Sequence, residues 1–235
     1  MSSPRLDHLR IRDARRHDAL LRACWRFRLR FVDLQPHITP EADWQAFRAY
    51  FEPDVNLEVY RDRGAEIRAM FAWSMRQVDC PDRPRVVIDA DYGFVDPALR
   101  RRIGATLFPQ IWLRAAWAGR SPVVTVLGAG YPSGVMSFGR VARRIRSLAD
   151  PDLEPWERRL LHDHCAHADC IDPARGLLRM RTRPREPRRE PRGPRSRALL
   201  AWYEAQVPRW QDGEGLADLV RFDPLHLLRG WLFGA

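Results

Sequence analysis

The sequence predicts an α+β fold in which a mixed, mostly antiparallel β-sheet is flanked by helices. Two observations predict it. Residues Ile67 to Arg76 alternate between a large apolar face and a mixed face, which is the two-residue period of a β-strand. A second strand-like run from Arg85 to Val95 passes through a turn and a triple arginine into an apolar stretch ending at Trp117, which is the order strand, turn, helix.

The N-terminal part is predicted to supply one strand and two helices. Leu9–Arg12 reads as a short edge strand, and an amphipathic helix follows from about Ala14 to Phe31 with Asp13 as its N-cap. A second helix is expected to begin at Thr39, whose side chain would cap it, with proline in the first turn. Its apolar face is aromatic and consists of Trp44, Phe47 and Phe51.

The middle of the chain is predicted to hold the sheet. Leu57–Tyr60 reads as a strand, and Asp62–Ala65 has the turn residues of a hairpin that leads into the alternating run from Ile67. After the helix that ends at Trp117 comes the apolar run Val123–Leu127. A buried strand that follows a crossover helix has this composition.

We expect four segments along the chain. Residues 1–150 form the main domain, in which a helix is expected from about Tyr131 to Leu148. Residues 151–180 form a helical extension, residues 181–197 an Arg/Pro-rich linker or loop, and residues 198–235 a C-terminal helical segment that docks on the main domain. The C-terminal segment is rich in tryptophan and leucine, which indicates that it is folded.

The charge distribution argues against a nucleic-acid partner. The chain has a formal net charge of +10, and all 40 basic residues are arginine, which is typical of coding bias in a GC-rich bacterial genome. Residues 179–197 carry nine arginines and only two glutamates, so most of the excess charge lies in the predicted linker. A nucleic-acid-binding surface needs this charge on a folded face.

The sequence contains no pattern typical of a signal peptide and no apolar run of 18 residues, so we expect a cytoplasmic protein without a membrane span. The four cysteines are therefore expected to be reduced thiols. The segment His162–Cys170 contains three histidines and two cysteines. Their spacing matches no standard zinc site, and histidines near the negative end of a helix explain them, so we expect no metal.

The turn after Val95 has the features of a phosphate-binding site. A helix that starts in a basic, glycine-containing turn offers backbone N–H groups without intrahelical partners, and its dipole favours an anion there. Arg100, Arg101 and Arg102 stand at this turn and can bind the same phosphates in bidentate fashion. The sequence therefore predicts a ligand that carries a pyrophosphate.

These elements resemble the GNAT superfamily of N-acyltransferases over roughly residues 8 to 140. Val95–Arg102 is similar to the family's approach to its phosphate loop of pattern Arg/Gln-x-x-Gly-x-Gly/Ala, and Ile103–Phe108 is similar to its exit. One glycine of the pattern is missing: counted from Arg100 the expected glycine is Ile103, and counted from Arg101 the last position is Thr106. The resemblance implies that acyl-CoA is the co-substrate. Its expected binding residues are Phe94, Val95, Arg100, Arg101, Arg102, Ile103, Gly104, Ala105 and Thr106.

In such a sheet the strand before the phosphate loop diverges from its neighbour, and Gly93 is consistent with a bulge there, although a plain strand with a permissive glycine explains it as well. A strand carboxylate would act as the general base. The candidates are Asp89, Asp91 and Glu58, and for each of them a structural ion pair with an arginine is the alternative. Tyr131 is the candidate general acid for the leaving thiolate, or else an aromatic residue packed beside a proline. The family often has Asn and Tyr in the helix that follows, where this chain has Pro132 and Phe138.

The leading expectation is thus an N-acyltransferase that moves an acyl group from acyl-CoA to a small-molecule or peptide amine. One alternative keeps the fold but takes a long acyl chain from acyl carrier protein, whose acidic surface would contact the arginines. Another is a non-catalytic binding or scaffold protein. The sequence does not identify the acceptor amine, and it is compatible with a homodimer.

Overall fold

The computed structural model describes residues 6–80, 84–121, 123–130, 132, 144–185 and 193–225. The helices are α1 (Asp18–Arg28), α2 (Pro40–Tyr50), α3 (Arg100–Ala118), α5 (Pro155–Ala166) and α6 (Pro194–Gln206), and two 3₁₀ turns are η1 (Ala14–Arg16) and η2 (Trp210–Asp212). The strands are β1 (Asp7–Ile11), β2 (Val32–Leu34), β3 (Asn56–Arg61), β4 (Ile67–Val78), β5 (Arg85–Val95), β6 (Val124–Gly130), β7 (Arg144–Arg146), β8 (Cys170–Asp172), β9 (Leu177–Arg179), β10 (Thr182–Pro184) and β11 (Glu214–Phe222).

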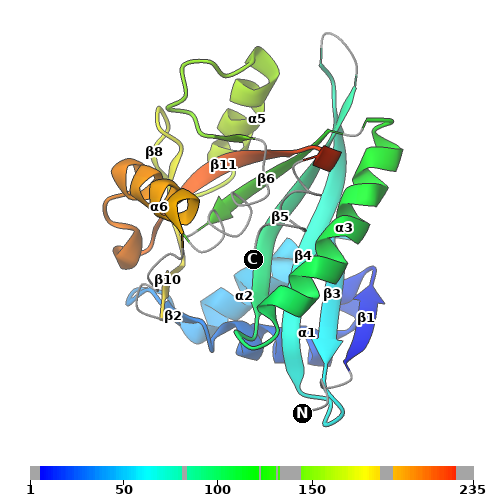
Figure 1. The fold of residues 1–235 in the computed structure, drawn as a ribbon. Coiled ribbons are helices and arrows are strands. Elements are labelled where there is room, and N and C mark those ends of the chain that lie inside the picture. The colour runs from blue at the N-terminus through cyan, green and yellow to red at the C-terminus, as the bar shows by residue number, and fades with distance from the viewer. Residues whose placement is uncertain are drawn as a thin grey trace.

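One mixed sheet organises the molecule (Figure 1). Its strand order is β1-β3-β4-β5-β6-β11-β9-β8, with β7 also paired to β11, and β2 and β10 form a separate two-stranded sheet. Among the described strands only β5 and β6 pair in parallel. The predicted α+β class, a mostly antiparallel sheet flanked by helices, is confirmed.

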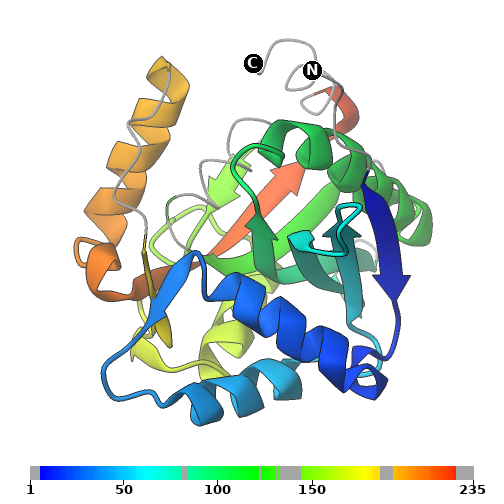
Figure 2. The same ribbon diagram turned by 90° about the horizontal axis from the view of Figure 1, so that it is seen from below.

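The helices cover both faces of this sheet. On one face of the sheet α3 packs over the central strands, and α6 packs over Leu216 of β11. On the other face α1 and α2 cover β3 and β4, and α5 covers β6 and β11. Figure 2 shows α1 and α2 side by side across this second face. The β5–β6 pair therefore lies in the middle of the sheet, between the two halves of the core.

The start of α2 forms as the sequence predicts. The Thr39 side chain accepts a hydrogen bond from the backbone N–H of Ala42 at 3.2 Å, and Pro40 occupies the first turn. The predicted aromatic face is buried in the core with α1, and it consists of Trp44, Phe47 and Phe51.

The first helix starts later than predicted, and the prediction that Asp13 is its N-cap is wrong. The backbone of Asp13 is left-handed (φ 53°), and its side chain caps nothing but pairs with Arg16 at 2.5 Å. Residues 14–16 form a 3₁₀ turn, and α1 runs only from Asp18 to Arg28. The amphipathic pattern located the helix, but the left-handed backbone of Asp13 and the 3₁₀ turn after it delay its start to Asp18.

The C-terminal half is less helical than predicted. The expected helix up to Leu148 is wrong at its end, because residues 144–146 form β7; residues 133–143 lie outside the described part. The expected helical extension holds α5, but β8 and β9 follow it, and the expected linker begins with β10. Residues 198–235 contain most of α6, as expected, and then β11, which lies beside β6 within the main sheet. The chain after residue 150 thus completes the sheet.

A buried ion pair joins α1 to α2. Arg28 donates to both carboxylate oxygens of Asp43, at 2.7 and 3.0 Å, and the indole N–H of Trp25 donates to the same carboxylate at 2.7 Å. Arg28 and Asp43 are 3% and 1% exposed. Such a pair is costly to break, because the remaining charge stays buried without its partner.

We therefore predict that Asp43→Ala lowers the free energy of unfolding by about 3–5 kcal/mol, as measured by urea denaturation. The matched control is Asp18→Ala, which removes an exposed ion pair with Arg48. The control should cost less than about 1 kcal/mol. Equal effects of the two variants would show that the buried pair does not hold α1 against α2.

Candidate functional site

The central feature of the sheet is the short pairing between β5 and β6. Their parallel register covers only Val87 with Thr125, Ile88 with Val126, and Asp89 with Leu127. Beyond Asp89, β5 continues to Val95 and stays paired with β4, while β6 continues to Gly130 and stays paired with β11. Within the described residues the two strands thus stop pairing after three residue pairs and diverge (Figure 1).

A β-bulge in β5 stands where the divergence begins. Ala90 and Asp91 together oppose Trp73 of β4, so β5 carries one extra residue there. A bulge bends its strand and increases the local twist, which turns the rest of β5 away from β6. For Gly93 the sequence left a bulge and a plain strand open, and Gly93 pairs in register with Phe71, as in a plain strand. A side chain at Gly93 would approach the Phe71 ring to 3.3 Å, so this glycine accommodates an aromatic neighbour.

The diverging end of β5 leads directly to the start of α3. Asp96 shapes the connecting turn: its side chain accepts a hydrogen bond from the Ala98 N–H at 3.1 Å and pairs with Arg68 at 2.9 Å. Leu99 precedes the helix and provides no side-chain cap, and the first turn contains no acidic residue. Among the described contacts this helix start thus has no side-chain cap and no acidic residue in its first turn, as expected of a helix end that binds phosphate.

The expected carrier-binding residues divide by location. The side chain of Phe94 packs partly against the α1–α2 core and that of Val95 partly against the α3 core, while Ile103 is buried in the α3 core. The side chains of Arg100, Arg101, Arg102, Ala105 and Thr106, and the surroundings of Gly104, lie outside the described part of the structure.

The candidate bases lie in different places. Asp89 is on β5, at the last β5–β6 pair, and Arg76 of β4 lies 3.0 Å from its carboxylate. Glu58 is fully buried on β3, where His8 at 2.7 Å, Arg10 at 2.5 Å and the Trp73 indole at 3.3 Å bind its carboxylate. Glu58 is separated from β5 by β4 and is held in a structural network, so the structure does not bring it together with Asp89.

Two other candidates fall largely outside the described residues. Asp91 is part of the bulge, but its side chain is not described. Tyr131 directly follows β6 and lies outside the described residues altogether. Both therefore remain predictions.

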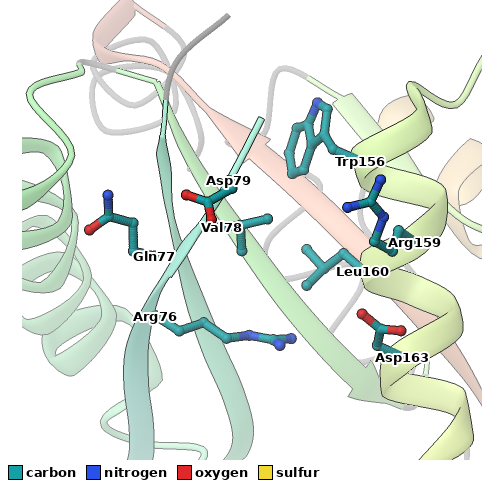
Figure 3. A pocket seen from close by; sticks show the side chains of 8 residues that line it. All are labelled: Arg76, Gln77, Val78, Asp79, Trp156, Arg159, Leu160 and Asp163. Carbon is teal, nitrogen blue, oxygen red and sulfur yellow. The ribbon is translucent and has the colours of Figure 1, made fainter. Parts of the chain in front are cut away.

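A hollow of about 180 Å³ lies on the α5 side of the sheet (Figure 3), and Arg76, the ion-pair partner of Asp89, lines it. It lies between the end of β4 and α5, and Arg76 extends from β4 across it towards Asp163. His164, next on α5, is half-buried, and burial lowers its pKa below the ordinary value despite the opposing effect of Asp89.

Asp218 on β11 is a residue that sequence reasoning missed. It is 5% exposed and has no hydrogen bond or ion pair with any residue in the described part of the chain. Burial raises the pKa of its carboxyl to about 8. The signal was present in the sequence, because Asp218 is a single carboxylate within the apolar run from Leu216 to Val220.

The described residues contain no group of three or more His, Cys, Asp or Glu side chains placed to hold a metal ion. No helix among them is long and apolar enough to span a bilayer.

The four cysteines are free thiols, and burial raises the pKa of Cys24 and of Cys165 to about 12. Neither buried thiol is therefore a nucleophile at neutral pH.

The central parallel pair of the sheet diverges at a bulge, and the next helix starts at the end of the diverging strand. The sequence resemblance implied this arrangement. The fold is similar to that of the GNAT superfamily. No protein-family model and no curated protein sequence matches it.

Solved structures similar to this one include several N-acetyltransferases. An aminoglycoside 6′-N-acetyltransferase from Acinetobacter baumannii is 18% identical, with 48% of this chain and 74% of that chain covered and a TM-score of 0.36. An acetyltransferase from Trypanosoma brucei is 12% identical, with 64% and 99% covered and a TM-score of 0.43. An aminoglycoside N-acetyltransferase in complex with CoA is 16% identical, with 58% and 84% covered and a TM-score of 0.39.

We predict that Asp218 makes stability depend on pH. Its pKa of about 8 in the folded state exceeds the ordinary value of 3.8, so the folded state keeps a proton that the unfolded state releases between these values. The free energy of unfolding should therefore fall as the pH rises from about 4 to 8. At about 1.4 kcal/mol per unit of pKa, the loss is on the order of several kcal/mol.

Asp218→Asn should remove this dependence, so the variant becomes more stable than the wild type as the pH approaches 8. Urea denaturation at several pH values measures the difference. The exposed Asp54 provides the control variant Asp54→Asn, which should follow the wild type. Parallel pH curves for Asp218→Asn and the wild type would mean that the carboxyl is not buried in its neutral form.

Proposed function

We propose that the protein is an N-acyltransferase that transfers an acyl group from acyl-CoA to an amine. The observation that carries the proposal is the divergence of β5 from β6 at the Ala90–Asp91 bulge, followed by an uncapped helix start at Arg100. An extended pantetheine arm suits the opening between two diverging strands. The pyrophosphate then falls at the basic start of α3.

The carrier would be held at two points. The first turn of α3 offers backbone N–H groups to the pyrophosphate, and Arg100, Arg101 and Arg102 add guanidinium groups there. Gly104, Ala105 and Thr106 continue this turn. Along β5, backbone groups beyond the bulge would bind the arm and polarise the thioester carbonyl. Both contacts use elements that packing against the α3 core holds rigid.

The thioester would then lie near the bulge, and the amine would approach from the α5 side through the hollow that Arg76, the ion-pair partner of Asp89, lines. Nucleophilic attack requires that the ammonium loses a proton. Asp89 and Asp91 stand on either side of Ala90 at this level, so each is a candidate base. Tyr131 follows the end of β6 and stays the candidate general acid. The alternative carrier, acyl carrier protein with a longer chain, uses the same opening.

The carrier site is tested by calorimetry. We expect acetyl-CoA, a longer acyl-CoA or free CoA to bind with measurable heat. The double variant Arg100→Ala, Arg102→Ala should weaken binding about tenfold or more, because it removes two charge-assisted contacts. Arg120→Ala, at the opposite end of α3, is the matched control and should bind normally. Absence of heat with every CoA compound would rule out a CoA enzyme, whereas binding only of acyl carrier protein would indicate the alternative carrier.

The base is tested by turnover. With an accepted amine, Asp89→Asn or Asp91→Asn should reduce kcat by about 10²–10⁴, because general base catalysis contributes that much. Asp79→Asn is the control, since Asp79 lines the hollow at the end of β4 but is not a candidate base. Full turnover in both Asp89→Asn and Asp91→Asn would show that neither carboxylate is the base.

A further inference from the structure

Asp218 lies in the sheet where a charged residue is hardest to accommodate. It pairs with Gly128 of β6 in the antiparallel β6–β11 ladder. Its neighbours at alternate positions of β11, Leu216 and Val220, belong to the cores under α6 and α3, so Asp218 belongs to the face that these two helices cover. A buried carboxyl that lacks a partner lowers stability. Groups with strongly shifted pKa values are concentrated at functional sites, so we expect such a residue to take part in the chemistry of the protein.

The carboxyl faces the point where β5 and β6 diverge. A methyl group built on Gly128 would lie 3.9 Å from Oδ1 of Asp218 and 3.6 Å from the carbonyl oxygen of Ala90 at the bulge. The absence of a side chain at Gly128 thus leaves a space with the Asp218 carboxyl on one side and the bulge on the other. Further along β6, a methyl group on Gly130 would meet no atom within 4 Å. The proposed thioester position borders this space.

The described groups around Asp218 offer no partner for its proton. On its face β6 presents Val126 and β7 presents Ile145, and the core under α3 is apolar. From β9 comes Leu177. On α6, Tyr203 packs in this core, and its hydroxyl donates to the carbonyl oxygen of Gly130 at 2.5 Å. Burial among these groups raises the pKa of Asp218 to about 8, so its carboxyl is mostly protonated at neutral pH.

We propose that Asp218 is the proton donor to the leaving thiolate during acyl transfer. The inference rests on the proposed function and gives Asp218 the role of general acid, for which Tyr131 is the alternative candidate. The C–N bond to the amine forms and the C–S bond breaks, with its electron pair going to sulfur. The carboxyl proton of Asp218 moves to that sulfur and gives a thiol, and the amine releases its own proton to the base on the opposite side.

Water then returns a proton to the Asp218 carboxylate, so no oxidant or further reactant is required. The donor is well matched to its task. An alkyl thiol has an ordinary pKa of about 8.5, and proton transfer is efficient between groups of similar pKa. Asp218 and Asp89 also lie on different strands on either side of β6, which separates the donor from the base.

The test compares leaving groups. Asp218→Asn keeps the shape of the side chain but has no transferable proton. Its kcat with acyl-CoA should fall about 10²-fold or more, while its kcat with an acyl thioester of a nitro-substituted thiophenol should stay close to that of the wild type, because that thiolate leaves without protonation. The wild-type kcat with acyl-CoA should decrease above about pH 8, and the variant should lack this decrease.

An infrared difference spectrum between the wild type and Asp218→Asn provides a measurement that does not depend on turnover. A protonated carboxyl band at pH 7 that shifts when CoA is added would place Asp218 beside the bound carrier, and a band unchanged by a saturating CoA concentration would overturn the proposal. Equal loss of activity with both thioesters, or no loss with either, would overturn the donor role alone. No transfer by the wild type from any thioester would instead overturn the proposed function.

Discussion

The structure depends on one constraint, the limit of three residue pairs between β5 and β6. A fully paired central ladder would close the sheet and leave no opening for a ligand. The Ala90–Asp91 bulge ends the pairing, and the β4 ladder on the other side keeps β5 in place beyond it. The same strand then leads to α3, so the divergence and the uncapped helix start are joined by a short, ordered turn. The divergence of the two central strands and the proposed carrier site therefore both depend on the Ala90–Asp91 bulge.

The C-terminal part of the chain holds the other side of this opening. Glu157 of α5 is fully buried and lies 3.3 Å from Arg146 of β7 and 3.1 Å from Arg221 of β11. These ion pairs hold β7 and β11 against α5, and the ladder between β11 and β6 brings Asp218 to the level of the bulge. Without β11, β6 would be an edge strand with an unpaired ladder. The segment after residue 150 thus contributes to the candidate site as well as to the core.

Local patterns predicted the elements, and non-local pairing determined the site. The Ile67–Arg76 alternation and the Thr39 cap depend on neighbouring residues, so both could be predicted. The bulge could not be placed, because its position depends on how β4 pairs with β5. Asp218 was missed for a similar reason: the apolar run around it has no clear period, and a buried strand cannot then be distinguished from a helix. Only the neighbouring β6 makes its position informative.

The central claim is that the opening between β5 and β6 holds an acyl carrier, and an amide NMR titration tests it most directly. Acetyl-CoA is added to the ¹⁵N-labelled protein, and chemical-shift changes are mapped onto the sequence. The account predicts that the largest changes occur in β5 from Ala90 to Val95, at Gly128 and Gly130, and in the first turn of α3. Changes confined to other parts of the chain, or none at saturating concentration, would contradict it.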